Sequence, residues 1–317
     1  MKVVSAIKRV PDSIKDRLTQ RFSQVEFAFY HGIEEAEPHL GEADIFVTYG
    51  EDLNPGRIEK AVRLKWIMVL SAGLDRMPFD EIADRGILVT NVRGIHAHPM
   101  AEYAISMLLQ VSRKAKTLIE QEQNHQWNRR PVMNEISGRT MVLLGTGAIC
   151  QETARLAQAF QMKTIGVSKS GKQKEYFHDT YKVEELKEVL SEADFVVAAL
   201  PSTEETKYLL KINHFQTMAD HAIFLNMGRG DLVSTEVVLK AVREKYIDHA
   251  VLDVFEEEPL PEDHPFWEEE NVTVTPHISG ISPYYQPRAF ERFEENLHIY
   301  LEGKEEMNNK IDPRRGY

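Results

Sequence analysis

The chain has very little cysteine and no long apolar run. Cys150 is the only cysteine among 317 residues, so an internal disulfide and a cysteine-based metal cluster are both excluded. No apolar stretch reaches the roughly 20 residues that a membrane-spanning helix needs. The first residues also lack the basic and then apolar pattern of a signal peptide. These absences favour a protein of the reducing cytoplasm that holds no metal.

Basic residues are fewer than acidic residues. The chain has 38 Lys+Arg against 50 Asp+Glu, a net charge of -12, and such a surface repels nucleic acids and anionic membranes on average. We therefore expect neither as a partner. The length suffices for two domains that each bury a core, and there is no low-complexity tract. A small molecule is the expected ligand.

Short apolar segments recur along the chain, with helical stretches between them. This alternation is typical of parallel sheets, and its two series predict two doubly wound α/β domains. The first series covers 2–7, 25–29, 44–48, 66–70 and 87–90, and the second covers 141–144, 164–167, 195–200, 222–226, 250–254 and 272–275.

Two amphipathic segments bear on how the domains connect. Apolar residues at helical spacing from Met100 to about Gln123 predict one long helix, which we expect to bridge the two domains. A dimer contact along this helix and simple packing on its own domain are the alternatives for its exposed face. The segment 290–301 is also amphipathic, and we expect it to return to the first domain. The predicted division is 1–97 with 285–317 as substrate domain, and 98–284 as cofactor domain.

A glycine turn follows the first strand of the second series. In Gly145-Thr146-Gly147-Ala148-Ile149-Cys150, the first glycine suits a tight turn and the second lets the main chain approach a pyrophosphate at a helix start. Cysteine replaces the usual third glycine at some packing cost. Such a glycine pair also occurs in α/β proteins without a dinucleotide. We expect Cys150 to be a buried structural thiol rather than a nucleophile.

Three polar residues follow later strands of the second series. They are Arg229 between two glycines, Glu258 after an acidic run, and His277 after Thr-Pro. Ligands bind beyond the carboxyl ends of parallel strands, an arginine can hold a carboxylate bidentately, and a histidine paired with a carboxylate can transfer a proton. Each could alone be a surface pair or a loop cap. Their joint placement beside a dinucleotide turn favours a site, with the flanking glycines giving the guanidinium room.

These stretches together resemble the D-2-hydroxyacid dehydrogenases. The matching motifs are 145–150, Leu-Pro-x-Thr at 200–203, N-x-x-R-G at 226–230, L-D-V-F-x-x-E-P at 252–259 and T-P-H at 275–277. The stretches 71–75 and 101–102 also look like family segments. The ending 312–317 is similar to that of the glyoxylate/hydroxypyruvate reductase A branch. The resemblance implies a Rossmann-type cofactor domain inserted in a flavodoxin-like substrate domain, and a homodimer.

The resemblance also implies roles for the residues. His277 would protonate the oxygen of a 2-oxo acid, Glu258 would orient the histidine, and Arg229 would bind the substrate carboxylate. Backbone amides at Ala72 and Gly73 would hold that carboxylate too, and Asp253 would lie near the nicotinamide. A role for His96 is in doubt, because many relatives carry asparagine there. The implied cofactor contacts are Gly145, Thr146, Gly147, Ala148, Ile149, Ser168, Lys169, Ser170, Lys172, Leu200, Pro201, Thr206, Met227, Gly228, Arg229, Asp253, His277 and Gly280.

The end of the second cofactor-domain strand indicates which nicotinamide cofactor is used. NAD-binding members carry an acid there for the ribose hydroxyls. This chain has Ser168, followed by Lys169, Ser170 and Lys172, so positive charge stands where a 2′-phosphate would lie. We predict a preference for NADP(H), with NAD(H) as the alternative. A solvated loop without cofactor contact is the other interpretation.

The leading hypothesis is an NAD(P)H-dependent reductase of a small 2-oxo acid, of the glyoxylate or hydroxypyruvate class. One alternative is an NAD-dependent dehydrogenase of a larger D-2-hydroxy acid. A dinucleotide-sensing corepressor-like protein is disfavoured, because the chain has no disordered tail or basic segment for chromatin partners. The substrate cannot be named, since Tyr49, Trp66 and Trp267 could line a pocket or belong to the core.

Overall fold

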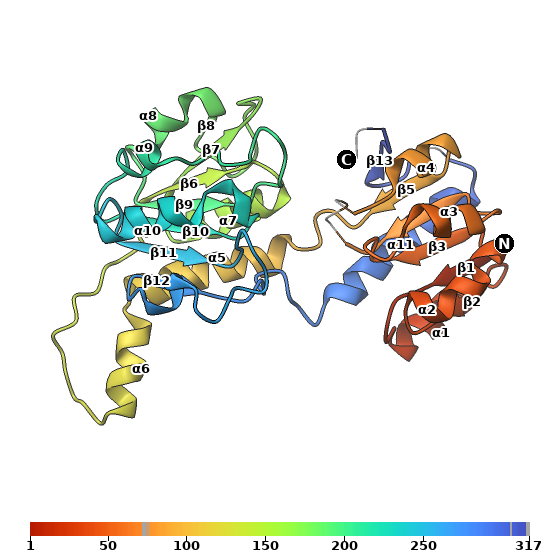
Figure 1. Ribbon diagram of the computed structural model, residues 1–317, viewed down its shortest axis with the longest axis horizontal. Coiled ribbons are helices and arrows are strands. Elements are labelled where there is room, and N and C mark those ends of the chain that lie inside the picture. The colour runs from red at the N-terminus through yellow and green to blue at the C-terminus, as the bar shows by residue number, and fades with distance from the viewer. Residues whose placement is uncertain (72–73, 75, 305, 315–317) are drawn as a thin grey trace. The chain divides into compact units, whose positions relative to one another are not determined.

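Contacts within the chain divide it into two compact units (Figure 1). The computed structural model describes residues 1–71, 74, 76–304 and 306–314. Unit 1 comprises Met1–Ile95 and Ser282–Tyr317, and unit 2 comprises His96–Ile281. None of the described helices combines the length and the apolar character that crossing a bilayer requires.

Unit 1 is built on a six-stranded sheet in the order β13-β5-β4-β3-β1-β2. Its five parallel strands follow the flavodoxin-like order, and β13 pairs antiparallel with β5 at one edge. The strands are β1 (Lys2–Ser5), β2 (Glu26–Phe29), β3 (Ile45–Thr48), β4 (Trp66–Val69), β5 (Leu88–Asn91) and β13 (Lys310–Ile311); the helices are α1 (Asp12–Arg21), α2 (Ile33–Ala36), η1 (Glu37–Glu42), α3 (Pro55–Lys60), α4 (Phe79–Asp84) and α11 (Tyr285–Leu301).

Unit 2 is built on a seven-stranded sheet in the order β12-β11-β10-β9-β6-β7-β8. All its pairs are parallel, and the order reverses beside β6, as in Rossmann folds. The strands are β6 (Thr140–Leu144), β7 (Lys163–Ser168), β8 (Asp179–Lys182), β9 (Phe195–Ala198), β10 (Ile223–Asn226), β11 (His249–Leu252) and β12 (Val272–Val274); the helices are α5 (Ala97–Ser112), α6 (Ala115–Gln123), α7 (Ala148–Ala159), η2 (Val183–Glu185), α8 (Leu186–Leu190), α9 (Ile212–Phe215), η3 (Gly230–Leu232), α10 (Thr235–Arg243) and η4 (Pro265–Glu268).

The prediction of two doubly wound α/β domains is confirmed. Strands such as β3, β4, β9 and β10 are buried at every residue, because helices cover both faces of a parallel sheet. That burial is why the strands are continuous apolar runs in the sequence. The short edge strands β8 and β13 carry weaker apolar patterns and were not expected.

The prediction of one long helix after residue 100 is wrong. The chain forms α5 and then α6, separated at Lys114, whose φ of 52° places it in the left-handed region. The amide of Lys114 bonds to the carbonyl of Val111 and closes α5. The apolar spacing continued across this break because α6 has apolar residues of its own, although none of them is buried.

The apolar face of α11 is buried in the core of unit 1. Phe290, Phe293 and Leu297 pack with residues of β1, β3 and β4. Trp66 on β4 also belongs to this core, since it is fully buried and its indole N–H donates to Thr90 Oγ1 at 2.9 Å. Of the two interpretations of Trp66, the core is therefore the right one.

A half-buried histidine at the start of β11, in contact with β12, should make the fold sensitive to acid. His249 Nε2 lies 2.9 Å from Thr273 Oγ1, and burial lowers the pKa of His249 from 6.5 to about 4. The unfolded chain therefore binds this proton first as the pH falls. The stability that neutral His249 contributes is complete above about pH 6.5 and is lost as the pH falls toward 4.

We expect the free energy of unfolding to fall over this pH window, by at most on the order of 3 kcal/mol from this group. Urea titrations at several pH values measure the fall. The variant His249→Gln should flatten the dependence, whereas His125→Gln on the surface should not. Equal pH dependence in wild type and His249→Gln would contradict the assignment.

Candidate active site

The glycine turn connects β6 directly to α7. Gly145 has a φ of 110°, a conformation that glycine adopts without the Cβ penalty. Gly147 is the N-cap of α7, and no side chain caps this helix end. A Cβ on Gly147 would meet nothing within 4 Å. The backbone at the start of α7 is therefore open to close approach, and an uncapped helix start can accommodate a phosphate group.

Cys150 fills the space beneath this turn. Its side chain is 1% exposed, its Sγ lies 3.8 Å from the carbonyl of Leu144, and a Cβ added to Gly145 would approach it to 3.4 Å. Burial raises the pKa of the thiol to about 12, so it stays protonated and unreactive at neutral pH. Cys150 is a packing residue at the position of the usual third glycine.

The Arg229 turn follows β10 and lies against two neighbouring loops. A Cβ on Gly230 would fall 1.9 Å from the backbone carbon of Phe255, and one on Gly228 would fall 2.6 Å from the carbonyl oxygen of Leu200. The glycines are therefore needed for close backbone approach. This close approach is a role of the glycines that was not expected from the sequence, where only the room they leave for the guanidinium was considered. Arg229 itself is half-buried and bonds to the carbonyl of Gly228 at 2.9 Å.

His277 and Glu258 lie in contact. His277 Nδ1 is 2.8 Å from Glu258 Oε2, and Glu258 Oε1 accepts the amide of Phe255 at 3.0 Å. Because Nδ1 faces the carboxylate, Nε2 is the nitrogen that can transfer a proton to a ligand. His277 has a φ of 53°, a left-handed conformation that costs roughly 1–2 kcal/mol for a side-chain residue.

Asp253 lies at the end of β11 and is fully buried. Its Oδ1 accepts from Thr275 Oγ1 at 2.6 Å and from the amide of Ile278 at 2.9 Å, and its Oδ2 accepts from the amide of Ser279 at 2.9 Å. Tyr103 on α5 reaches Thr275 Oγ1 at 2.7 Å. The sequence gives no sign of Tyr103 as a site residue, since it looks like an ordinary helix residue, and it marks Thr275 only as the first residue of the T-P-H motif.

His96 precedes α5 and is half-buried in unit 2. Burial, together with the positive charge of Arg229, lowers the pKa of His96. A Cβ on Gly280 would come within 3.0 Å of its ring. The histidine is therefore neutral at neutral pH and lies within electrostatic range of Arg229, although the asparagine pattern had left its role in doubt.

The loop after β7 has the polar character that the sequence predicts. Ser168 Oγ accepts the amide of Gly171 at 3.2 Å, and Ser170 Oγ accepts the amide of Lys172 at 3.3 Å. The Lys169 ammonium lies 3.0 Å from Glu205 Oε1. That contact lowers the pKa of Glu205. Glu205 was not expected here, because it is 36 residues away in the sequence.

The other expected site residues follow β4, β9 and β10 in the sequence. Ala72 and Gly73 lie outside the described residues. Thr206 Oγ1 donates to the carbonyl of Pro201 at 2.6 Å, which holds the loop after β9. Leu200 is half-buried beside Gly228, and Met227 is buried at the end of β10.

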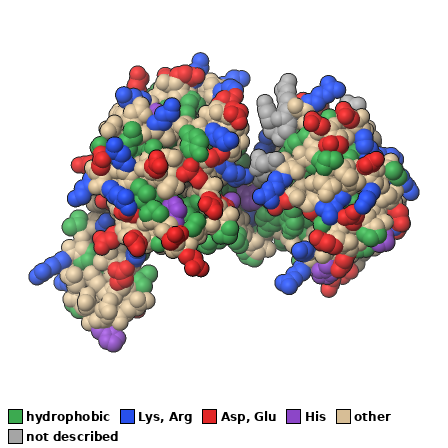
Figure 2. All heavy atoms as spheres, viewed as in Figure 1, with side chains coloured by type: hydrophobic (Ala, Val, Ile, Leu, Met, Phe, Trp, Pro, Cys, Tyr) green, Lys and Arg blue, Asp and Glu red, His purple; other side chains and the backbone are tan. Residues whose placement is uncertain are grey.

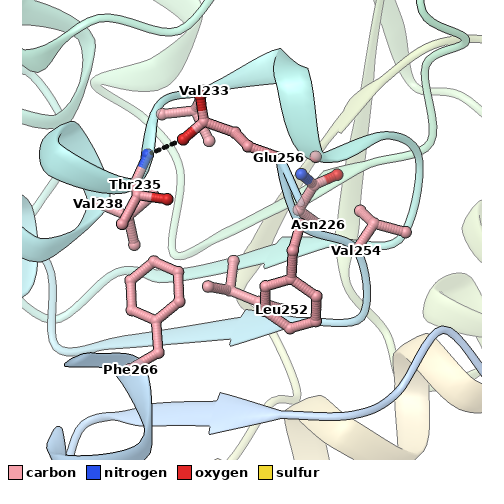
Figure 3. Close-up of a pocket in the computed structure, with 10 residues that line it drawn as sticks. Asn226, Val233, Thr235, Val238, Leu252, Val254, Glu256 and Phe266 are labelled. Atoms are coloured by element: carbon pink, nitrogen blue, oxygen red, sulfur yellow. Dashed lines mark hydrogen bonds between the residues drawn. The ribbon is translucent and has the colours of Figure 1, made fainter. Parts of the chain in front are cut away.

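A small pocket lies behind the Arg229 turn (Figure 3). Val233, Val238, Leu252 and Phe266 contribute apolar walls, and Glu256 accepts the amide of Thr235 at 2.6 Å. Its cavity of about 10 Å³ holds at most one water. This space is a packing gap and not a ligand site. Within the described part of the chain no group of three or more His, Cys, Asp or Glu is arranged to hold a metal.

The arrangement in unit 2 fits a nicotinamide dinucleotide. The glycine turn, Arg229 and His277 all follow strand ends at the same edge of one parallel sheet, where such ligands bind. A family model for the D-isomer specific 2-hydroxyacid dehydrogenase, NAD binding domain, matches residues 105–279. The chain belongs to this family. Its members are oxidoreductases, and the match lies within unit 2.

Relatives in the family agree over most of the chain. A glyoxylate reductase of Pyrococcus furiosus is 31% identical over 83% of this chain and 81% of its own length. A family protein from Aeromonas salmonicida has a TM-score of 0.86 at 32% identity, covering 98% of this chain and 99% of that one. An NADPH-dependent glyoxylate/hydroxypyruvate reductase from Sinorhizobium meliloti, solved with NADP and sulfate, has a TM-score of 0.81 at 26% identity, covering 100% and 99%.

Proposed function

We propose that this D-2-hydroxyacid dehydrogenase reduces a small 2-oxo acid, of the glyoxylate or hydroxypyruvate class, with NADPH. The contact between His277 and Glu258 carries the proposal. It places a histidine with a fixed ring orientation at the sheet edge that also carries the glycine turn. Reduction of a carbonyl needs a proton donor there.

Each residue has one task in the proposed reaction. Arg229 binds the substrate carboxylate by paired hydrogen bonds. The bound cofactor supplies the hydride to the carbonyl carbon. His277 gives the proton on Nε2 to the carbonyl oxygen, and Glu258 stabilises the charged ring before that transfer. The product is the D-2-hydroxy acid.

The variant His277→Gln tests this assignment. General acids contribute about 10²–10⁴-fold to rate, so we expect kcat to fall by about that factor while NADPH binding, followed by fluorescence, persists. Glu258→Gln should lower kcat less, because the histidine remains. The surface variant His298→Gln is the control.

The wild-type rate comes from NADPH absorbance with glyoxylate, hydroxypyruvate, pyruvate and a bulky aryl 2-oxo acid in parallel. The absence of turnover with all four would overturn the proposed function. Rates of His277→Gln close to those of the wild type would remove His277 from the mechanism. Faster turnover of the aryl acid with NADH would favour the dehydrogenase of a larger acid.

The preference for NADPH rests on the loop after β7. No carboxylate stands at Ser168 to repel a 2′-phosphate, and Lys169 and Lys172 are exposed beside it. In the structure Lys169 pairs with Glu205, and both side chains are largely solvated. A phosphate can therefore replace Glu205 as the partner of Lys169 at small cost.

Changing this loop should change the cofactor preference. Hydrogen bonds to charged groups contribute about 1.5–3 kcal/mol, so we expect Ser168→Asp and Lys169→Ala each to lower kcat/KM for NADPH by about 10- to 100-fold. The kcat/KM for NADH should stay the same or rise. Lys240→Ala, on a distant helix, is the control. Equal losses with both cofactors would show that the loop does not contact the 2′-phosphate.

We also propose that the protein is a homodimer, joined through an arm formed by residues 113–135. In the arm, α6 has no buried residue, and Trp127 and Val132 are 94% and 76% exposed. Figure 1 shows α6 extending away from the sheet of unit 2, and Figure 2 shows apolar side chains exposed on it. The arm has five cationic against three anionic side chains, whereas the whole chain has a net charge of -12. The net negative charge of a second copy of the chain complements the positive charge of the arm.

Light scattering after size-exclusion chromatography measures the molecular mass of the protein in solution. We expect the wild type at twice the chain mass, and Trp127→Ala shifted toward the monomer as the concentration is lowered. Trp267→Ala, an exposed tryptophan outside the arm, should leave the mass unchanged. A wild-type monomer at micromolar concentration would contradict the proposal.

A further inference from the structure

The segment 275–279 is tied to Asp253 on both sides of His277. Thr275 precedes the histidine, and the amides of Ile278 and Ser279 follow it; all donate to this one carboxylate. The amide of His277 bonds to the carbonyl of Thr275 at 3.0 Å. The left-handed backbone at His277 persists only where the surroundings over-determine it. The carboxylate is what fixes it.

The hydroxyl of Thr275 has one proton, which it donates to Asp253 Oδ1. It can therefore only accept from Tyr103, so the phenol O–H is the donor in that contact of 2.7 Å. Burial, together with the charge of Asp253, raises the pKa of Tyr103, which keeps the phenol protonated. The result is a chain of hydrogen bonds that all donate in one direction, from Tyr103 through Thr275 to Asp253.

The same carboxylate lies at the junction of three strand ends. The amide of Asp253 bonds to the carbonyl of Asn226 at the end of β10, and the amide of Thr275 bonds to the carbonyl of Leu252 at the end of β11. Asn226 in turn donates from Nδ2 to the carbonyl of Arg229 at 2.9 Å. Loss of this chain of hydrogen bonds would therefore loosen the 275–279 segment first.

We infer that Tyr103 and Thr275 are positioning residues, which act through Asp253 to hold the 275–279 segment and so place His277 for proton transfer. Neither side chain needs to touch substrate or cofactor. The effect on rate rests on the proposed function, whereas the effect on the loop does not. The chain of hydrogen bonds starts at Tyr103 on α5, so it links the orientation of that helix to the position of His277.

The variants Tyr103→Phe and Thr275→Val remove only hydroxyl groups, and Thr275→Ser keeps one. The matched controls are Tyr246→Phe, whose hydroxyl bonds to Glu244 on the surface, and Thr273→Val, on β12 two residues before Thr275 but bonded to His249. Amide hydrogen exchange of Ile278 and Ser279 reports the loop. Steady-state kinetics with NADPH and the best 2-oxo acid report the rate.

We expect both loop amides to exchange faster in Tyr103→Phe and Thr275→Val, and to stay protected in Thr275→Ser and the controls. Misplacing a catalytic group by about 1 Å costs about 100-fold in rate, so kcat should fall by about tenfold in Tyr103→Phe and about 100-fold in Thr275→Val. The KM values should stay within about twofold of the wild type. Thr275→Ser should recover most of the rate.

Unchanged exchange in both variants would overturn the inference. So would faster exchange with an unchanged kcat, or equal losses in Thr273→Val, which would indicate a general loss of stability. If the wild type turns over none of the acids, the proposed function fails. The exchange data then still decide whether Tyr103 and Thr275 hold the loop.

Discussion

The active edge of unit 2 depends on one buried negative charge. Burying an isolated carboxylate costs several kcal/mol unless donors surround it, and Asp253 has a hydroxyl and two amides directed at it. Those donors come from the stretch on either side of His277. The requirement to satisfy the carboxylate therefore determines the path of the histidine loop.

Close backbone contacts position the other side of this edge. Gly228 and Gly230 let the Arg229 turn lie directly against the loops that follow β9 and β11. Asn226 bonds within the same turn, to the amide of Gly228 and the carbonyl of Arg229. The Arg229 turn is thus held by main-chain contacts between neighbouring strand ends, and such contacts leave it little freedom.

Much of this could be predicted from the sequence, because the responsible patterns are local. Buried parallel strands are apolar runs between helices, and the turn at Gly145 needs glycine for its φ of 110°. The break at Lys114 could not be predicted, since it involves neither glycine nor proline. The pairing of Lys169 with Glu205 and the contacts of Thr275 with Tyr103 and Asp253 could not be predicted either, because those partners are far apart in the chain.

The sequence by itself determined the family, the two-sheet architecture and the identity of the residues at the strand ends. It did so because strand periodicity and short motifs depend on neighbours along the chain. Only the tertiary structure decided that His277 contacts Glu258 and that Asp253 is buried. These facts depend on which strand ends meet at one edge of the sheet. That meeting is set by the order β12-β11-β10-β9-β6, which no local pattern specifies.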